Sequence, residues 1–220
     1  MNVRPIQTQE IERVAGWLQE ERNSRWLDFG GGRKSVDAVG LKVMCQRPLH
    51  FLRVFTPDDE DRPIGIVGLS NVDRDFGTAE AWGVLGEKEY GRHDLTVRAS
   101  AQLLEEAFRT LELRSIFAWT VEVNRGGQRL LERLRFRFVG RRRQCHRVNG
   151  RLHDRLLYDL LAEEYTGYDP ARSYRSAIPA QAGAGRAGAG QEGVGQAGVG
   201  QADTAQAGGS PGDPVKGERT

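Results

Sequence analysis

The stretch from Thr78 to Leu111 constrains the fold of this chain more than any other. It begins with a short apolar run at 79–85, passes through a loop that contains Gly91, and continues with apolar residues at three- and four-residue steps. Those steps predict a helix with one buried face from Thr96 onward, and the run before the loop predicts a strand. A strand that feeds a glycine loop opening a helix directs free backbone N–H groups and the positive helix end at one spot. That spot suits a phosphate or pyrophosphate; the alternative is a simple tight turn.

Three segments of the chain resemble the GNAT (Gcn5-related N-acetyltransferase) superfamily, in particular the RimJ/RimL-type branch that acetylates the N-termini of ribosomal proteins. The first is AEAWGVLGEKEYGRHDLTVRA, which follows the family's acetyl-CoA loop up to Gly91. The second is VEVNRGGQRLLERLRF, with Asn124, Glu132 and Phe136 in register, and the third is NGRLHDRLLYDLL. The resemblance covers roughly residues 1–165 and implies an α+β fold, with a mixed, mostly antiparallel sheet of about seven strands, flanking helices and a splayed parallel strand pair.

The resemblance also implies acetyl-CoA as the co-substrate, bound without a metal ion. It assigns cofactor contacts to the loop and to the asparagine after the next strand: Leu85, Gly91, Arg92, His93, Asp94, Leu95, Thr96 and Asn124. The chain departs from the family at His93 and Asp94, where a second glycine is usual. Asp94 would repel phosphate unless its carboxylate turns outward or caps the helix, and Arg92 can compensate by a charge-assisted bond. For Asn124, a cap on the following helix competes with the cofactor contact.

Direct transfer of an acetyl group to an amine requires a general base, an N–H group for the carbonyl oxygen and a donor for the leaving thiolate. The resemblance assigns the base to Glu80, acting directly or through a water; a solvated strand residue is the alternative. Where relatives carry Ser or Tyr as the thiol-side donor, this chain has Gly127 and Leu131. That role therefore has no candidate in the sequence.

The acceptor side is expected in the glycine-rich connection RWLDFGGGRKS, which separates the first two predicted helices. In the family this region forms the wall of the substrate pocket. The implied substrate-binding residues are Trp26, Phe29 and Arg33, together with Trp82 on the central strand. Core packing is the alternative interpretation of Trp82.

Local signals place the remaining elements. Thr8 is a plausible cap for a helix over 9–21, and Ser35 for a helix near 36–45 that Pro48 ends. The dipeptide Asn149-Gly150 predicts a tight hairpin. Further elements are expected as strands over 2–6, 50–55, 64–72, 115–123, 136–148 and 151–161, and as a helix over 127–134.

Composition narrows the function classes. The 32 Lys and Arg residues nearly balance the 30 Asp and Glu residues, so bulk charge does not indicate a nucleic-acid-binding protein. The two cysteines, Cys45 and Cys145, are too few for a disulfide framework and fit a reducing cytosol. The chain shows no apolar leader and no apolar run that could span a bilayer. We therefore expect a cytoplasmic monomer or homodimer with no membrane partner and no direct DNA binding.

Nine arginines fall between Arg133 and Arg155. The simplest interpretation is a hairpin with one solvated basic face. The alternative is an anionic partner, such as the cofactor's ribose phosphate, an acidic acceptor or ribosomal RNA. His146 and His153 lie among these arginines without a second ligand pair at metal spacing, which argues against a metal site.

The composition changes at about residue 165. From 181 to 210 the chain repeats in fives, rich in glycine, alanine and glutamine, and offers too few apolar side chains to offset the entropy of ordering. We therefore predict an acetyltransferase domain over 1–165 and a disordered tail over 166–220, although Tyr168 and Tyr174 are suited to pack on the domain.

Together these features predict an acyl-CoA-dependent N-acetyltransferase that transfers acetyl from acetyl-CoA to a primary amine, either a protein N-terminus or a small amine or amino sugar. The alternative is a catalytically degenerate module of the same fold that binds CoA or a protein without turnover. The departures at His93, Asp94, Gly127 and Leu131 favour that alternative.

Overall fold

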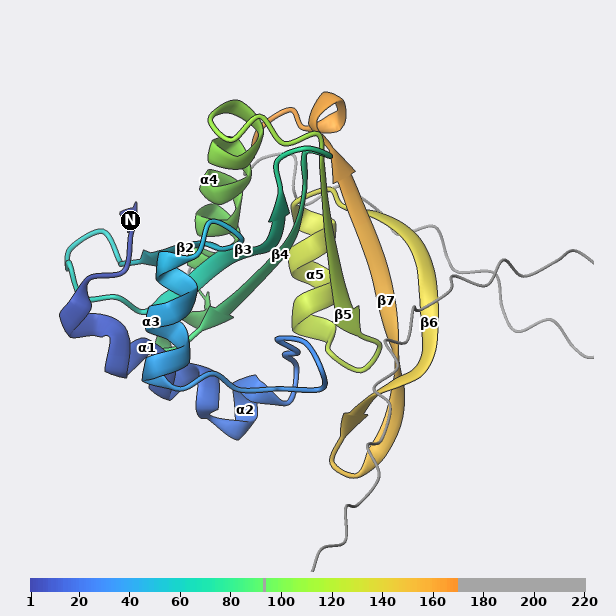
Figure 1. Ribbon diagram of the computed structural model, residues 1–220, viewed down its shortest axis with the longest axis horizontal. Coiled ribbons are helices and arrows are strands. Elements are labelled where there is room, and N and C mark those ends of the chain that lie inside the picture. The colour runs from blue at the N-terminus through green and yellow to red at the C-terminus, as the bar shows by residue number, and fades with distance from the viewer. Residues whose placement is uncertain (93, 170–220) are drawn as a thin grey trace, which may run out of the picture. The chain divides into compact units, whose positions relative to one another are not determined.

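The computed structural model describes residues 1–92 and 94–169. Their strands form one seven-stranded sheet in the order β1-β2-β3-β4-β5-β7-β6 (Figure 1). The strands are β1 (Val3–Arg4), β2 (Phe51–Phe55), β3 (Gly65–Asp73), β4 (Thr78–Leu85), β5 (Ser115–Val121), β6 (Arg137–Val148) and β7 (Arg151–Leu161). The helices are η1 (Thr8–Glu10), α1 (Ile11–Gln19), α2 (Glu21–Ser24), α3 (Ala38–Gln46), η2 (Lys88–Arg92), α4 (Leu95–Arg109), α5 (Arg125–Arg133) and η3 (Ala162–Glu164). The predicted α+β fold with a mixed, mostly antiparallel sheet is confirmed.

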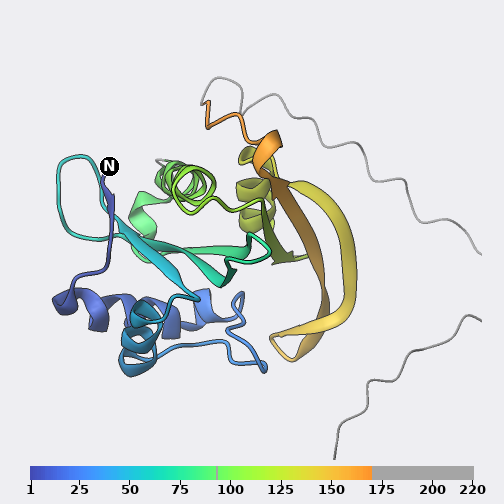
Figure 2. The same cartoon turned by 45° about the horizontal axis from the view of Figure 1, so that its top comes forward.

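Two helical layers enclose the sheet. Helices α4 and α5 cover one face, and α1 and α3 cover the other (Figure 2). Strand β3 lies between the layers, so its residues from Gly65 to Leu69 are all buried. Along this strand Val67 and Leu69 pack in the α4 layer, whereas Ile66 packs in the α1 and α3 layer. This two-sided burial explains why the strand is apolar without alternation.

The parallel pair β4–β5 is joined only at its beginning. Three register pairs connect Thr78–Glu80 with Ser115–Phe117, and no further pair links the two strands in the described part of the chain. Strand β4 continues to Leu85 beside β3, and β5 continues to Val121 beside β7. The predicted splay is therefore present, and it begins at Glu80.

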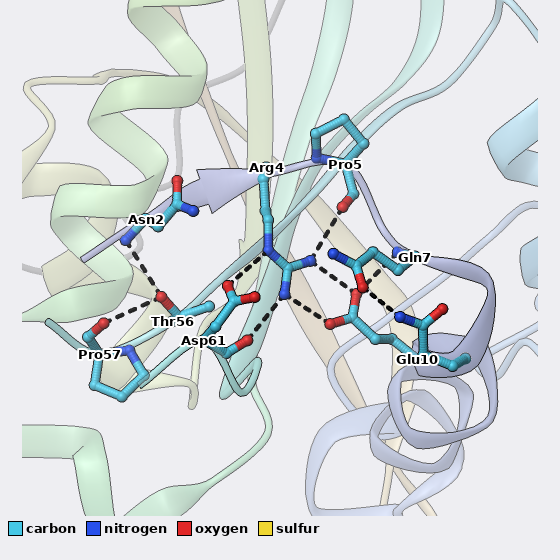
Figure 3. Close-up of polar contacts among 9 residues, drawn as sticks. Asn2, Arg4, Pro5, Gln7, Glu10, Thr56, Pro57 and Asp61 are labelled. Carbon is cyan, nitrogen blue, oxygen red and sulfur yellow. Dashed lines mark hydrogen bonds and ion pairs between the residues drawn. The ribbon is translucent and has the colours of Figure 1, made fainter. Parts of the chain in front are cut away.

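An arginine cluster fastens the N-terminal strand (Figure 3). The guanidinium of Arg4 donates to both carboxylate oxygens of Glu10, at 2.9 and 2.7 Å, and its Nε donates to Asp61 at 3.1 Å. Glu10 also accepts from the backbone N–H of Gln7 at 2.8 Å. These bonds join β1, the first helical turn and the loop before β3.

Two predicted helix caps are wrong. Asp37, not Ser35, caps α3, because its Oδ1 accepts from the N–H of Gly40 at 2.7 Å. Thr8 is the first residue of η1 rather than a cap, and the carboxylate of Glu10 reaches back to the backbone before it. Near α3 the sequence offers two capping residues, Ser35 and Asp37, and the structure uses the second.

The hairpin prediction is confirmed. Strands β6 and β7 pair from Val148 and Arg151 inward, and Asn149 and Gly150 between them both have positive φ, at 48° and 77°. Those angles suit a two-residue turn of the type that Asn-Gly favours.

The predicted disordered tail falls almost entirely on 170–220, outside the described residues. Within the described part, Tyr168 packs against the α4 side of the core, and Arg133 donates to its hydroxyl at 3.0 Å. Tyr174 lies outside the described residues. None of the helices in the described ranges combines the length and apolarity that a bilayer crossing requires.

Candidate active site

A cavity of about 820 Å³ lies where β4 and β5 separate. It is lined on one side by α3 and by the segment 25–33 between α2 and α3, called here the acceptor loop. On the other side it is lined by residues of α4 and α5, including Leu103, Leu131 and Leu134. This cavity, called here the central cavity, therefore connects the two faces of the sheet. Its volume is in the range of small-molecule sites.

The structure brings together six of the candidates named from the sequence. The central cavity is lined by Glu80, Trp82, Trp26, Phe29, Arg33 and Asn124. The cavity lining does not include Leu85, Gly91, Asp94, Leu95 or Thr96. Leu85, at the end of β4, is close to Gly91, because a Cβ built on that glycine would lie 3.7 Å from the Leu85 side chain. His93 lies outside the described residues.

Glu80 is a partly buried carboxylate with two hydrogen-bond donors. The indole N–H of Trp119 on β5 donates to its Oε1 at 2.6 Å, and the side-chain amide of Asn71 on β3 donates to its Oε2 at 3.3 Å. Burial raises the pKa of Glu80, and those hydrogen bonds oppose the rise. A carboxylate of raised pKa is a stronger base than a solvated one.

The acceptor loop brings an aromatic wall to the cavity. Phe29 packs edge-on against Trp82, with ring centroids 5.3 Å apart and an interplanar angle of 89°. The turn that presents Phe29 is closed by a 2.7 Å bond from its N–H to the carbonyl of Arg33. The three glycines between them have positive φ of 95°, 61° and 77°, which side chains other than glycine rarely adopt.

Sequence analysis missed His50, which also lines the central cavity. Its Nδ1 lies 3.1 Å from the hydroxyl of Ser70, and the same hydroxyl accepts from the indole of Trp82 at 2.9 Å. Burial lowers the pKa of His50, so the ring is neutral at pH 7. His50 precedes β2, and only the pairing of Phe51 with Leu69 brings it beside Ser70. No local sequence signal indicates that pairing.

The first turn of α4 carries the phosphate-binding prediction. Asp94 stands at the N-cap with φ 55° and makes no side-chain cap, so the first amides of α4 are not occupied by it. Its carboxylate is instead paired with Arg133 of α5, the longer of the two bonds being 2.8 Å. The hydrogen bonds from Arg133 hold the pKa of Asp94 below its ordinary range. The negative charge that Asp94 adds to the loop is thus compensated by a neighbouring helix.

Asn124 caps α5 and also lines the cavity. Its Oδ1 accepts from the N–H of Gly127 at 3.1 Å, and this bond does not use the side-chain nitrogen. The two roles considered for Asn124 are therefore compatible in one conformation.

The space at Gly127 is occupied by a threonine hydroxyl. A Cβ built on Gly127 would lie 2.4 Å from the Oγ1 of Thr120 on β5. Thr120 is only 4% exposed, lines the cavity and has no hydrogen-bond partner for its hydroxyl among the described residues. Leu131, at the other position where relatives carry a hydroxyl, is buried in the core. Sequence analysis missed Thr120 because a threonine in a strand is ordinary and its neighbour is distant in the chain.

Ion pairs within the domain involve several of the nine arginines of the hairpin region. Four of them pair with carboxylates: Arg133 with Asp94, Arg137 with Glu164, Arg141 with Glu122 and Asp154, and Arg155 with Asp28. The run is therefore partly structural rather than one solvated basic face. In the described part of the chain, no group of three or more His, Cys, Asp or Glu side chains is arranged to hold a metal ion.

Comparison with known proteins adds independent findings. A family model described as an acetyltransferase (GNAT) domain matches residues 1–137. Uncharacterized N-acetyltransferase p20 of Bacillus licheniformis is 31% identical over 109 residues, which are 50% of this chain. The match covers 61% of that protein, which is less than two thirds of its length. Putative ribosomal N-acetyltransferase YdaF of Bacillus subtilis (strain 168) is 24% identical over 173 residues, 76% of this chain and 94% of that protein. The structure of Mycobacterium smegmatis RimJ in complex with CoA-disulfide shares the fold, with a TM-score of 0.61 and 19% identity over 74% of this chain and 83% of that one.

Proposed function

We propose that this chain, which belongs to the GNAT acetyltransferase family, is an N-acetyltransferase that uses acetyl-CoA to acetylate a primary amine. The observation that carries the proposal is the Glu80 carboxylate, which lies at the point where β4 and β5 separate and lines a cavity reaching both faces of the sheet. Family membership supports acetyl transfer in general. The amine acceptor and the residue roles belong to the proposal.

The residues present fit acetyl-CoA. Beyond Glu80, the edge of β4 that faces β5 has no strand partner in the described chain, so its N–H and C=O groups are available to an extended amide-containing ligand. The uncapped first turn of α4 offers backbone amides for the pyrophosphate. Acetyl-CoA supplies the acetyl group as a thioester. Asn124 and the β4 edge are the groups that would hold its arm.

In this proposal Glu80 accepts the proton that the amine nitrogen loses when its lone pair bonds to the acyl carbon. The C–S bond of the thioester breaks in the same transfer, and CoA would leave as a thiolate that takes up a proton from solvent. The raised pKa of Glu80 brings its basicity closer to what an ammonium acceptor requires. The unpaired N–H groups of β4 are donors for the acyl oxygen. Phe29 and Trp82 form the apolar wall against which the acceptor is held.

The acceptor belongs to one of two classes, a protein N-terminus or a small amine or amino sugar. The name of the Bacillus subtilis relative favours a protein N-terminus. A panel that contains both classes, assayed by thiol release from acetyl-CoA, distinguishes them and identifies the acceptor.

Cofactor binding is tested separately by thermal unfolding with acetyl-CoA. At about 100 times the Kd, ligand linkage should raise the melting temperature by roughly 5–10 °C. Gly91→Glu should abolish the rise by placing a carboxylate at the pyrophosphate loop. Gly140→Glu on β6 is the matched control, since its Cβ meets open space and the residue lies outside the cavity lining. An unchanged melting temperature of the wild type at millimolar acetyl-CoA would contradict the proposal and support the degenerate module.

A further inference from the structure

Arg155 of β7 lies at the centre of a group of side chains from four separate segments. Its NH2 donates to Oδ2 of Asp28 in the acceptor loop at 2.6 Å. The same nitrogen lies 2.9 Å from Nδ1 of His146 on β6. Its guanidinium carbon lies 3.8 Å from the centre of the Trp119 ring on β5, so the two side chains form a cation–π interaction. The Arg155 side chain is 12% exposed, so these contacts are made largely out of water.

His146 ties the same group to the acceptor loop a second time. Its Nε2 lies 2.8 Å from the carbonyl oxygen of Arg25, which can only accept, so Nε2 carries the proton. Nδ1 is then free to accept from Arg155. Burial and the Arg155 charge lower the pKa of His146, which keeps the ring neutral. Arg155 and His146 together therefore fasten both Arg25 and Asp28 to the hairpin.

The strands reach this arrangement through an irregularity in β6. The register between β6 and β7 shifts between Arg142 and His146, and Gln144 within the shift has φ 46°. Pairing resumes at His146 opposite His153, so the shift brings His146 closer along β7 to Arg155 than regular pairing, which would place it opposite Arg151. Such bulges commonly redirect a side chain beside a functional site.

The contacts continue from Arg155 to Glu80. Trp119, whose face Arg155 covers, is the residue whose indole N–H donates to Glu80 at 2.6 Å. We propose that Arg155 is a positioning residue, which joins the acceptor loop through Asp28 to the indole that holds the Glu80 carboxylate. The acceptor wall and the base are thereby held as one unit.

This inference rests on the proposed role of Glu80. The charged groups that act on Glu80 are Arg155, which lowers its pKa, and Asp28, which raises it. His146 contacts Arg155. His50 contacts Ser70, the residue of β3 that pairs with Glu80 of β4. Removing the positive charge of Arg155 leaves Asp28 without this ion-pair partner and removes a charge that lowers the pKa of Glu80. Arg33 and Arg47, which also line the cavity, stay in place. The ionised form of Glu80 then becomes less favourable.

The first test is the pH dependence of kcat/KM in Arg155→Met. The acid limb should move upward by about one pH unit, which is roughly a tenfold loss of activity at a pH on that limb. Arg155→Lys keeps the charge without the planar fork and should shift the limb less. Arg141→Met is the matched control, because Arg141 lies on the same hairpin and pairs with Glu122 and Asp154 away from Glu80. A limb that stays in place in Arg155→Met would overturn the inference.

The second test does not need turnover. Carboxyl ¹³C NMR follows the titration of Glu80, assigned by the resonance that disappears in Glu80→Gln. The midpoint should be higher in Arg155→Met than in the wild type and unchanged in Arg141→Met. An equal midpoint in Arg155→Met and wild type would refute the positioning role even if the protein transfers no acetyl group. Conversely, the midpoint could be higher in Arg155→Met while the wild type transfers no acetyl group. That result would contradict only the proposed function.

A double-mutant comparison completes the design. If Arg155 acts through Glu80, Arg155→Met should cost about tenfold in the wild-type background at acid-limb pH and little in Glu80→Gln. Equal losses in both backgrounds would show that Arg155 supports the fold rather than the base. Should Arg155→Met fold poorly because Asp28 is left unpaired, Asp28→Asn/Arg155→Met removes both charges and allows the same comparison.

Discussion

Two buried arginine–carboxylate pairs, Arg4–Glu10 and Arg155–Asp28, have similar N–O distances of 2.7 and 2.6 Å but different surroundings. In both, the arginine is less than one fifth exposed. Arg4 also reaches Asp61, 57 positions away, and Arg155 reaches Asp28, 127 positions away. Arg4 is surrounded by framework groups: Glu10, Asp61 and backbone carbonyls (Figure 3). Arg155 instead meets a neutral histidine and an indole ring that leads to Glu80. The Arg4–Glu10 pair therefore stabilises the fold, whereas the Arg155–Asp28 pair, by our proposal, positions the general base Glu80.

The difference follows from what completes the hydrogen bonding of each arginine. Acidic and carbonyl oxygens satisfy the donors of Arg4, so its charge acts on no other titrating group of the site. The partners of Arg155 leave part of its charge uncompensated toward the cavity, where Glu80 and Asp28 both respond to it. Substitutions in the two clusters should therefore affect different observables.

The largest effect is expected from Glu80→Gln. The amide is nearly isosteric and still accepts from Trp119, so acetyl-CoA binding should persist while turnover falls roughly 10²- to 10⁴-fold. Because burial raises the folded-state pKa, ionising Glu80 costs stability as pH rises above 4.5, and the variant should be at least as stable as wild type at pH 7. Steady-state kinetics and thermal unfolding check both statements. Near-normal turnover across the pH range would assign the base to another group, such as His50.

The opposite pattern is expected from Glu10→Gln, which should lower the free energy of unfolding by about 1.5–3 kcal/mol, the contribution of hydrogen bonds to charged groups, and leave the activity of the folded protein unchanged. The hydrogen bonds from Arg4 lower the pKa of Glu10, against the effect of burial. Its stabilisation is therefore present above the unfolded-state pKa near 4.5 and is lost as pH falls through the lower folded-state value.

Urea unfolding at neutral and strongly acidic pH measures this difference. The gap between wild type and Glu10→Gln should be wide at pH 7 and nearly closed in strong acid. Glu12→Gln, one turn into the same helical segment and exposed, is the matched control and should show little change at either pH. A gap of equal size at both pH values would indicate that packing, not charge, makes Glu10 important.

The smallest effect concerns Thr120, which lines the cavity and whose hydroxyl has no hydrogen-bond partner among the described residues. Replacing its unpartnered buried hydroxyl with the methyl of valine should raise the free energy of unfolding by about 1 kcal/mol. Thr110→Val at the exposed end of α4 should give no such gain. Destabilisation of Thr120→Val in thermal unfolding would mean that the hydroxyl is hydrogen-bonded in solution. A loss of turnover without destabilisation would indicate a contact with the leaving thiol.

Local patterns predicted the elements that build the site. The buried face of α4, the apolar run of β4 and the Asn149-Gly150 turn all depend on residues within a few positions of one another, and each was confirmed within a few residues. The predicted cap of α3 was wrong because serine and aspartate, the types of Ser35 and Asp37, cap helices about equally well. The choice between them depends on where the chain enters the helix, which neighbouring segments decide.

Residue type and spacing, with a family resemblance spread over three segments, were sufficient to predict the sheet, its splay and Glu80 at the splay. The tertiary structure decided which charges meet. The pairing of Asp94 with Arg133 spans 39 positions and that of Asp28 with Arg155 spans 127, and Thr120 faces Gly127 only because α5 folds back on β5. Periodicity records which face of an element is buried, since that depends on neighbours along the chain. The packing of strands that are distant in the chain decides which side chains share a low-dielectric cavity. No local sequence pattern indicates that packing.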